Sequence, residues 1–300
     1  MSTIGRVTQA TMRNSTLTNL QTNMKQMSLL QSQMSSGVKI TVASDDPGGA
    51  ADVLRIKSEQ RMLDQYDRNA ADGEAWLLTV DSALTTSLSA LNKARTLTVN
   101  GGNGALGDSS RVALAEEIDG LKDTLLQQAN TTYLGRSVFA GTTSGAAFGD
   151  ADDAAGAYTY TGVDGASVTR TVASGSTVRV DSSGSAVFGE GTDSVFQLLD
   201  DISATLRAGG DPTDQLDAID GYLDKMKTEL ASVGARENQI DSAQDLIATK
   251  VVTAASRLSA VQDVDLAQII LDLQSQEVAY QGALGAAAQV LQPTLLDFLS

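Results

Sequence analysis

Two segments carry residue types whose spacing suits the binding of a ligand. Glycines at 102, 104 and 107 have the spacing of a loop that wraps the phosphates of a dinucleotide. Such a loop follows a strand and needs an acidic residue about 20 positions onward to hold the ribose. Here Glu116 and Asp119 come too early, and the preceding residues have a helical pattern. A turn between two helices is therefore the better interpretation.

The aspartates Asp150, Asp152 and Asp153 offer oxygen atoms of the kind that calcium prefers. The central glycine and the closing glutamate of a calcium loop are missing, so a solvated turn is favoured and a weak cation site is the alternative. The chain has no cysteine and no histidine, which excludes thiol chemistry, zinc–cysteine sites and the usual general base. We therefore predict that the protein is not an enzyme and has no cofactor and no metal site.

The net charge of the 300-residue chain is −16, which argues against binding to nucleic acid or to an anionic membrane. No apolar run approaches the ~20 residues of a membrane span. The first residues lack the apolar block and the cleavage site of a conventional secretion signal. These features indicate a cytoplasmic protein unless a dedicated export route exists.

A heptad pattern of apolar residues runs through the C-terminal part of the chain and slips by one residue at Asp263–Asp265. Glu237 and Gln244 interrupt it at core positions. The pattern predicts a long helix that lays one stripe against other helices, with the stripe turned toward different neighbours beyond the slip. Its members are Leu216, Ile219, Leu223, Met226, Leu230, Val233, Ile240, Ile247, Val251, Ala254, Leu258 and Val261, then Leu266, Ile269, Leu273, Gln276, Tyr280, Ala283, Ala287 and Val290.

The N-terminal segment has a heptad stripe of its own, and its charge is opposite to that of the C-terminus. Residues 1–44 contain bases and no acid, whereas residues 258–300 contain acids and no base. Matching stripes and opposite charges predict that the two terminal segments pair. Because a lone pair of thin helices buries little, we expect both termini to become ordered only when several subunits pack together. The N-terminal stripe consists of Leu17, Leu20, Met24, Met27, Met34 and Val38.

The middle of the chain changes from helical patterns to short alternating runs and back. Helices are expected at about 48–99, after Asp108, at 194–208 and at 213–261, with a cap and first-turn proline at Asp46–Pro47. Alternation at 158–160, 168–172 and 178–180 predicts short strands. The predicted fold is mainly α: a long coiled-coil-like helical rod formed by both termini, with a small β-rich outer domain inserted in the middle. The predicted domains are 1–44 plus 264–300, 45–140 plus 194–263, and 141–193.

The chain resembles the bacterial flagellin superfamily over nearly its whole length. The resemblance is carried at the N-terminal end by LLQSQMSSGVKI (29–40), ASDDP (43–47), QYDRN (65–69) and DSAL (81–84), and at the C-terminal end by VGAR (233–236), DVDLA (263–267) and LLDFL (295–299). Within the superfamily it looks most like the hook–filament junction proteins. This likeness rests on Asn130 followed by GRSVFAGT (135–142), on the short β insert, and on the C-terminal ending.

The resemblance implies an adaptor that joins hook to filament by polymerising through its terminal helices. Its implied partners are copies of itself, neighbouring hook-associated and flagellin subunits, and an export chaperone on the C-terminal helix. The implied location is extracellular, after export by the flagellar apparatus without a cleaved signal. A bulk flagellin is the near alternative, and a secreted adhesin or cation-binding module acting through the β insert is the more distant one. The residues expected to pack terminal helices and subunits are Leu17, Leu20, Met24, Met27, Met34, Val38, Leu266, Ile269, Leu273, Tyr280, Val290 and Leu291.

Overall fold

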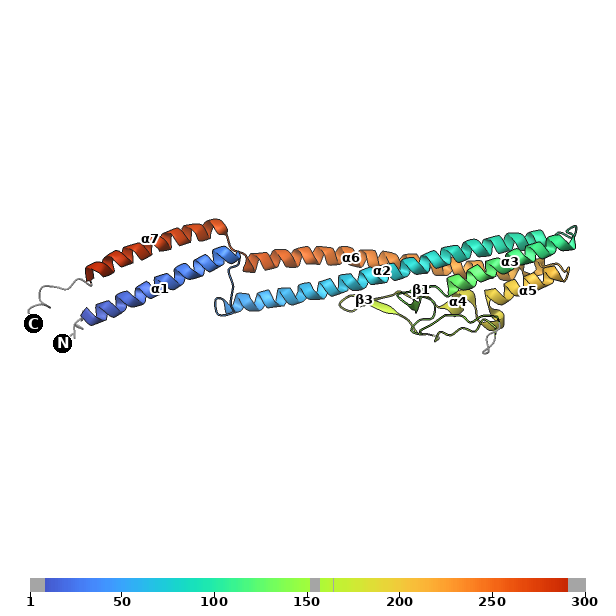
Figure 1. Cartoon of the computed structure of the whole chain (residues 1–300), viewed down its shortest axis with the longest axis horizontal. Helices are drawn as coiled ribbons and strands as arrows, with labels where there is room; N and C mark the ends of the chain where they lie inside the picture. Colours follow the sequence, from blue (N-terminus) through green and yellow to red (C-terminus); the bar gives the residue numbers. More distant parts are fainter. Residues whose placement is uncertain (1–8, 152–156, 164, 291–300) are drawn as a thin grey trace, which may run out of the picture. The chain divides into compact units, whose positions relative to one another are not determined.

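The computed structural model describes residues 9–151, 157–163 and 165–290, and its elements are shown in Figure 1. The chain divides into two compact units, one of residues 1–61 and 251–300 and one of residues 62–250. The mainly α fold with a small β insert is confirmed. The helices are α1 (Gln9–Ser36), α2 (Pro47–Gly101), α3 (Asp108–Ala129), α4 (Gly184–Phe188), α5 (Val195–Arg207), α6 (Leu216–Gln262) and α7 (Leu266–Val290). The strands are β1 (Thr132–Tyr133), β2 (Arg136–Ser137), β3 (Thr169–Ala173) and β4 (Ser176–Arg179).

The ends of α1 and the start of α2 follow from local sequence. Helix α1 ends at Ser36 because Gly37 adopts a φ of 71° and its N–H donates to the Gln33 carbonyl (2.9 Å). Helix α2 begins at Pro47, whose missing N–H is not needed in a first turn. The Asp46 carboxylate accepts from the N–H groups of the two residues after Pro47, at 3.1 and 3.0 Å. The predicted cap and first-turn proline are confirmed.

The slip in the C-terminal heptads is a break between two helices rather than a change of pitch within one. Helix α6 ends at Gln262, whose carbonyl accepts from the Lys39 N–H at 2.6 Å. Asp263 then forms an isolated antiparallel bridge with Val38. The Asp265 carboxylate caps α7 by accepting from the backbone N–H of Ala267 at 2.9 Å. The interruption coincides with backbone hydrogen bonds from Lys39 N–H to the Gln262 carbonyl and from Val264 N–H to the Gly37 carbonyl, groups that a continuous helix would pair internally.

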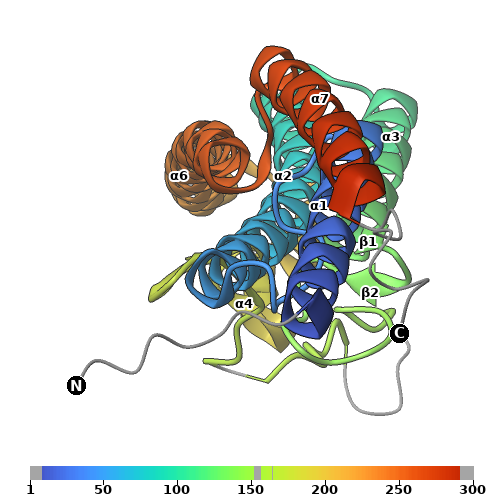
Figure 2. The same cartoon turned by 90° about the vertical axis from the view of Figure 1, so that its left-hand side faces the viewer.

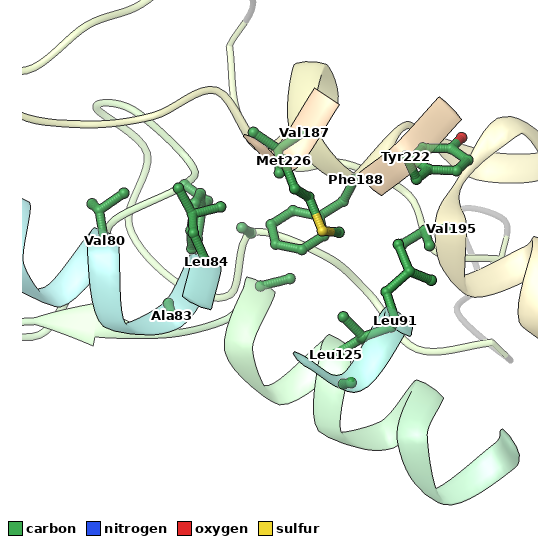
Figure 3. Close-up of a cluster of buried hydrophobic side chains, with 14 of the residues drawn as sticks. Val80, Ala83, Leu84, Leu91, Leu125, Val187, Phe188, Val195, Tyr222 and Met226 are labelled. Atoms are coloured by element: carbon green, nitrogen blue, oxygen red, sulfur yellow. The ribbon is translucent and has the colours of Figure 1, made fainter. Parts of the chain in front are cut away.

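The second unit contains one large hydrophobic core, part of which Figure 3 shows. Helices α3 and α5 pack together, and both α2 and α6 contribute leucines and other aliphatic residues to the same core. The centre is aromatic: the Phe148 and Phe196 rings lie 5.2 Å apart, as do those of Phe139 and Phe188. The insert therefore shares its core with the helices that flank it, because Phe148 and Phe188 belong to the insert.

The β insert contains less strand than the alternation predicts. The runs at 168–172 and 178–180 form the antiparallel pair β3–β4, as expected. The run at 158–160 forms no strand, which corrects the prediction. Tyr158 has a φ of 50°, and Tyr160 makes only an isolated bridge to Phe148. Residues 184–188, which the prediction places in the β-rich domain, form the short helix α4.

Tertiary contacts explain why Tyr158 leaves the extended conformation. Its hydroxyl donates to the Asp200 carboxylate on α5 at 2.5 Å, and the other oxygen of that carboxylate accepts from the Lys122 ammonium on α3 at 2.6 Å. Burial and the Asp200 charge raise the pKa of Tyr158 to about 12. Side-chain bonding has thus overridden strand propensity at this position.

Candidate subunit interface

The terminal helices α1 and α7 lie side by side in the first unit, and Figures 1 and 2 show the pair from two directions. They run antiparallel, because α1 ends and α7 begins next to the Val38–Asp263 bridge. Midway along the pair, the Gln276 amide donates to the Asn23 carbonyl at 3.4 Å. The helices α1 and α7 therefore pair within one copy.

One stripe of α7 faces α1. Ile269 and Ala287 are 7% and 4% exposed, and the residues between them at alternating steps of four and three are half-buried. On α1, Leu30 is buried at 7% exposure, and Leu20 and Met27 are half-buried. This is the geometry of a two-helix seam with a heptad repeat. The half-buried residues of the α7 stripe are Leu273, Gln276, Tyr280 and Ala283.

Other predicted packing residues are exposed in the single copy. Leu17 is 54% exposed, Met24 53%, Met34 39% and Leu266 52%. Val38 is half-buried beside its bridge to Asp263. The side chain of Val290 and the whole of Leu291 lie outside the described residues. Exposure of large apolar side chains is the condition under which neighbouring subunits would bury them, and their role in subunit packing stays a prediction.

Helix α7 also presents a second apolar face that the heptad analysis missed. Ile270, Leu271, Val278 and Leu284 are all exposed, by 44% or more. They lie off the seam, so α7 has apolar residues on most of its circumference. A helix of that kind is normally buried on all sides. The signal was present in the sequence, but a search for one stripe passes over residues that fall outside it.

The first unit buries few large apolar side chains by itself. Among its described residues, the buried hydrophobic positions are Leu30, Ile56, Ala254, Ile269 and Ala287. The aromatic core and nearly all other buried leucines, isoleucines and valines belong to the second unit. The first unit therefore has a thin core and a large exposed apolar surface.

Opposite charges on α1 and α7 form no ion pair among the described side chains of the single copy. Among the described side chains, Lys25 of α1 makes no ion pair with Asp272 or Glu277 of α7. The apolar seam holds the pair together, and the charges act on it only at longer range.

The segments with ligand-like spacing do not form a ligand site in the described part of the chain. Residues 102–107 join the helices α2 and α3, so the strand that a dinucleotide loop requires is a helix here. Asp150 is exposed and lies outside helices and strands, and Asp152 and Asp153 fall outside the described residues. No group of three or more acidic side chains among residues 9–151, 157–163 and 165–290 is placed to hold a metal. Within the same ranges, every helix is too short or too polar for a membrane crossing.

Comparison with known proteins identifies relatives that share both sequence and fold. Residues 7–144 match the family described as the bacterial flagellin N-terminal helical region. The chain is 28% identical to flagellar hook-associated protein 3 of Salmonella typhimurium over 283 residues, covering 85% of this chain and 87% of the relative. It is 38% identical to flagellin D of Vibrio cholerae over 114 residues, but that match covers only 30% of the flagellin and 38% of this chain.

Solved structures agree on the fold. A flagellar hook-associated protein 3 from Legionella pneumophila superposes with a TM-score of 0.63 at 16% identity, over 70% of this chain and 98% of that one. The structure of a flagellar junction protein from the same organism superposes with a TM-score of 0.59 at 16% identity, over 71% and 100%. Together these findings confirm the resemblance to the flagellin superfamily and, within it, to the hook-associated branch.

Proposed function

We propose that this chain is a structural subunit of the bacterial flagellum that joins the hook to the flagellin filament. One observation carries the proposal: the match to the Salmonella hook-associated protein spans 85% of this chain and 87% of the relative. The match to flagellin D covers only 30% of that protein and 38% of this chain, so the similarity to flagellin is limited to part of each sequence. Bulk flagellin is therefore the weaker alternative.

The proposed mechanism is polymerisation through α1 and α7. In one copy, α1 covers a single stripe of α7, and Ile270, Leu271 and Val278 stay exposed. Burying such side chains yields on the order of 2 kcal/mol each, so packing among copies has a large driving force. The exposed faces of α1 and α7 differ, and contacts between unlike faces are head-to-tail, so they extend along a helical lattice instead of closing as a dimer. Copies of the chain, hook-associated proteins and flagellin are the proposed partners.

The same surface bears on export. An exposed apolar helix is prone to associate before it reaches its destination, and a chaperone covering α7 would prevent this. We therefore include an export chaperone among the partners and place the working protein outside the cell, in the flagellum, after export without a cleaved signal. The role is that of a structural subunit rather than an enzyme, in keeping with the structural relatives.

Immunogold labelling of whole flagella with an antibody to residues 165–190 tests the proposal. A short labelled band between hook and filament is the expected result, and a strain lacking the chain is the control. Label along the entire filament would make the protein a flagellin. Absence of label from both regions, in cells that produce the chain, would overturn the flagellar assignment.

A further inference from the structure

The two-residue turn between β1 and β2 carries an exposed leucine in a conformation that leucine rarely adopts. Leu134 and Gly135 have φ values of 49° and 78°, which is the geometry of a tight hairpin turn that favours Asn, Asp or Gly at its first position. Leu134 is also 80% exposed, more than any other large apolar side chain in the described part of the protein. Within one copy, this side chain strains the backbone and gains no burial.

The turn is held firmly and carries positive charge. The Tyr133 ring packs at 5.4 Å from the Trp76 ring, and the Arg136 guanidinium lies 5.5 Å from the same ring. Arg136 makes no ion pair with any described carboxylate. Residues 133–136, which we call the hairpin tip, therefore present an apolar side chain next to an uncompensated cation on a rigid support.

A complementary surface lies on the other side of α2. Leu78 is 55% exposed and stands two residues beyond Trp76, so it points about 200° away from the side that supports the hairpin. Glu74 and Asp81 are its neighbours four residues before and three after, on the same face of the helix.

Helix α6 adds two more acids to this surface. The Gln244 amide of α6 donates to the Glu74 carboxylate at 2.9 Å, so α6 runs alongside this part of α2. Glu237 and Asp241 stand seven and three residues before Gln244, on the same face of α6. In keeping with this arrangement, burial raises the pKa of Glu237, and the charges of Asp81, Asp241 and Glu74 raise it further. None of the four forms an ion pair among the described residues, and one oxygen of Glu237 is buried without a hydrogen-bond partner. We call Glu74, Leu78, Asp81, Glu237 and Asp241 the acidic face. It combines exposed apolar area with uncompensated negative charge.

We propose that the hairpin tip of one copy docks on the acidic face of a second copy. Leu134 would bury against Leu78, and Arg136 would bring a cation to Asp81 and Asp241. Because tip and face lie on different sides of α2, the contact joins unlike surfaces and repeats from copy to copy. This inference rests on the proposed function, since it requires copies to stand next to one another. It adds a contact made by the second unit to those proposed for the terminal helices.

Disulfide trapping in assembled flagella tests the contact. The chain has no cysteine, so the double variant Leu78→Cys, Leu134→Cys introduces the only two thiols. Mild oxidation of flagella from a strain carrying this variant should give dimers and higher multimers on a non-reducing gel. Each single variant should stay monomeric, because tip does not meet tip and face does not meet face.

A charge exchange provides a second measurement. Arg136→Glu in the double-cysteine background should reduce the multimers about tenfold, and adding Asp81→Arg should restore them. Absence of multimers from flagella that contain normal amounts of the chain would overturn the docking contact and leave the proposed function standing. Dimers from Leu134→Cys alone would overturn it too. Absence of the chain from flagella, seen by immunoblot for the wild-type protein, would instead refute the proposed function.

Discussion

Replacing Leu273 by aspartate separates assembly from folding. Leu273 is half-buried in the seam between α1 and α7, in the first unit. Removing half of a leucine's burial costs about 1 kcal/mol. Forcing a carboxylate into the same place costs on the order of 2 kcal/mol more. The pairing of α1 with α7 should therefore weaken by about 3 kcal/mol. The first unit buries too few large apolar side chains to stay folded after such a loss.

The second unit offers an internal reporter of folding. Trp76 is the only tryptophan in the chain, is 1% exposed and lies in the second unit. Its fluorescence during urea unfolding should give a free energy within about 0.5 kcal/mol of the wild-type value, because Leu273 belongs to the other unit. Leu273→Met is the matched control, since it keeps an apolar side chain of similar volume.

The expected phenotype is loss of assembly with a folded second unit. Cells that carry only Leu273→Asp should be non-motile and should lack the labelled band between hook and filament, whereas cells with Leu273→Met should swim. Normal filaments on the aspartate strain would refute the role of the seam. A Trp76 transition lowered by more than about 1 kcal/mol would show that the two units do not fold as separately as argued.

Three further variants test the second unit by urea unfolding. Tyr158→Phe should cost about 1 kcal/mol at pH 7. The folded pKa of Tyr158 is raised to about 12, so the free energy of unfolding of the wild-type protein should decrease as pH rises from 10 to 12. In the variant this decrease should be smaller. Identical pH profiles for the two proteins would refute the contact. Leu134→Asn should stabilise the free chain by about 1 kcal/mol by relieving a strained turn, and destabilisation would contradict the strain. The folded pKa of Glu237 is raised, so its protonation should increase the free energy of unfolding of the wild-type protein as pH falls from 7 toward 4. Glu237→Gln should remove this increase. A variant with the same pH profile as the wild type would count against the raised pKa.

Signals confined to a few neighbouring residues predicted the structure well. The start of α2 at Pro47, the end of α1 before Gly37, and the start of α5 after Ser194 all follow from capping residues. Heptad spacing predicted the α7 residues from Ile269 to Ala287 that lie toward α1, whereas Leu266 of the same stripe is 52% exposed. In each case the deciding interaction is made within one turn of helix or along one helix face.

Contacts between distant residues decided the features that the sequence did not predict. Alternation at Tyr158–Tyr160 gave no strand, because Asp200 is more than 40 positions away and binds the Tyr158 hydroxyl. Periodicity alone cannot tell a heptad slip at Asp263 from a break, because the partner that pairs there, Val38, is distant in the sequence. Asp265, which caps the start of α7, is a local sign that a new helix begins there. An analysis of apolar periodicity does not take capping residues into account.

The two units differ in how much apolar surface they bury, and we infer from this that stability and assembly are divided between them. An aromatic core that includes Phe148 and Phe196 gives the second unit the burial that a domain needs without partners. The first unit buries one apolar seam and leaves Leu271 and Val278 more than half exposed. Any neighbour that covers these side chains binds the ordered form only, so it stabilises that form by mass action. We therefore expect ordering of the terminal helices and growth of the assembly to be coupled, since a copy outside the assembly would lack the contacts that complete its first unit.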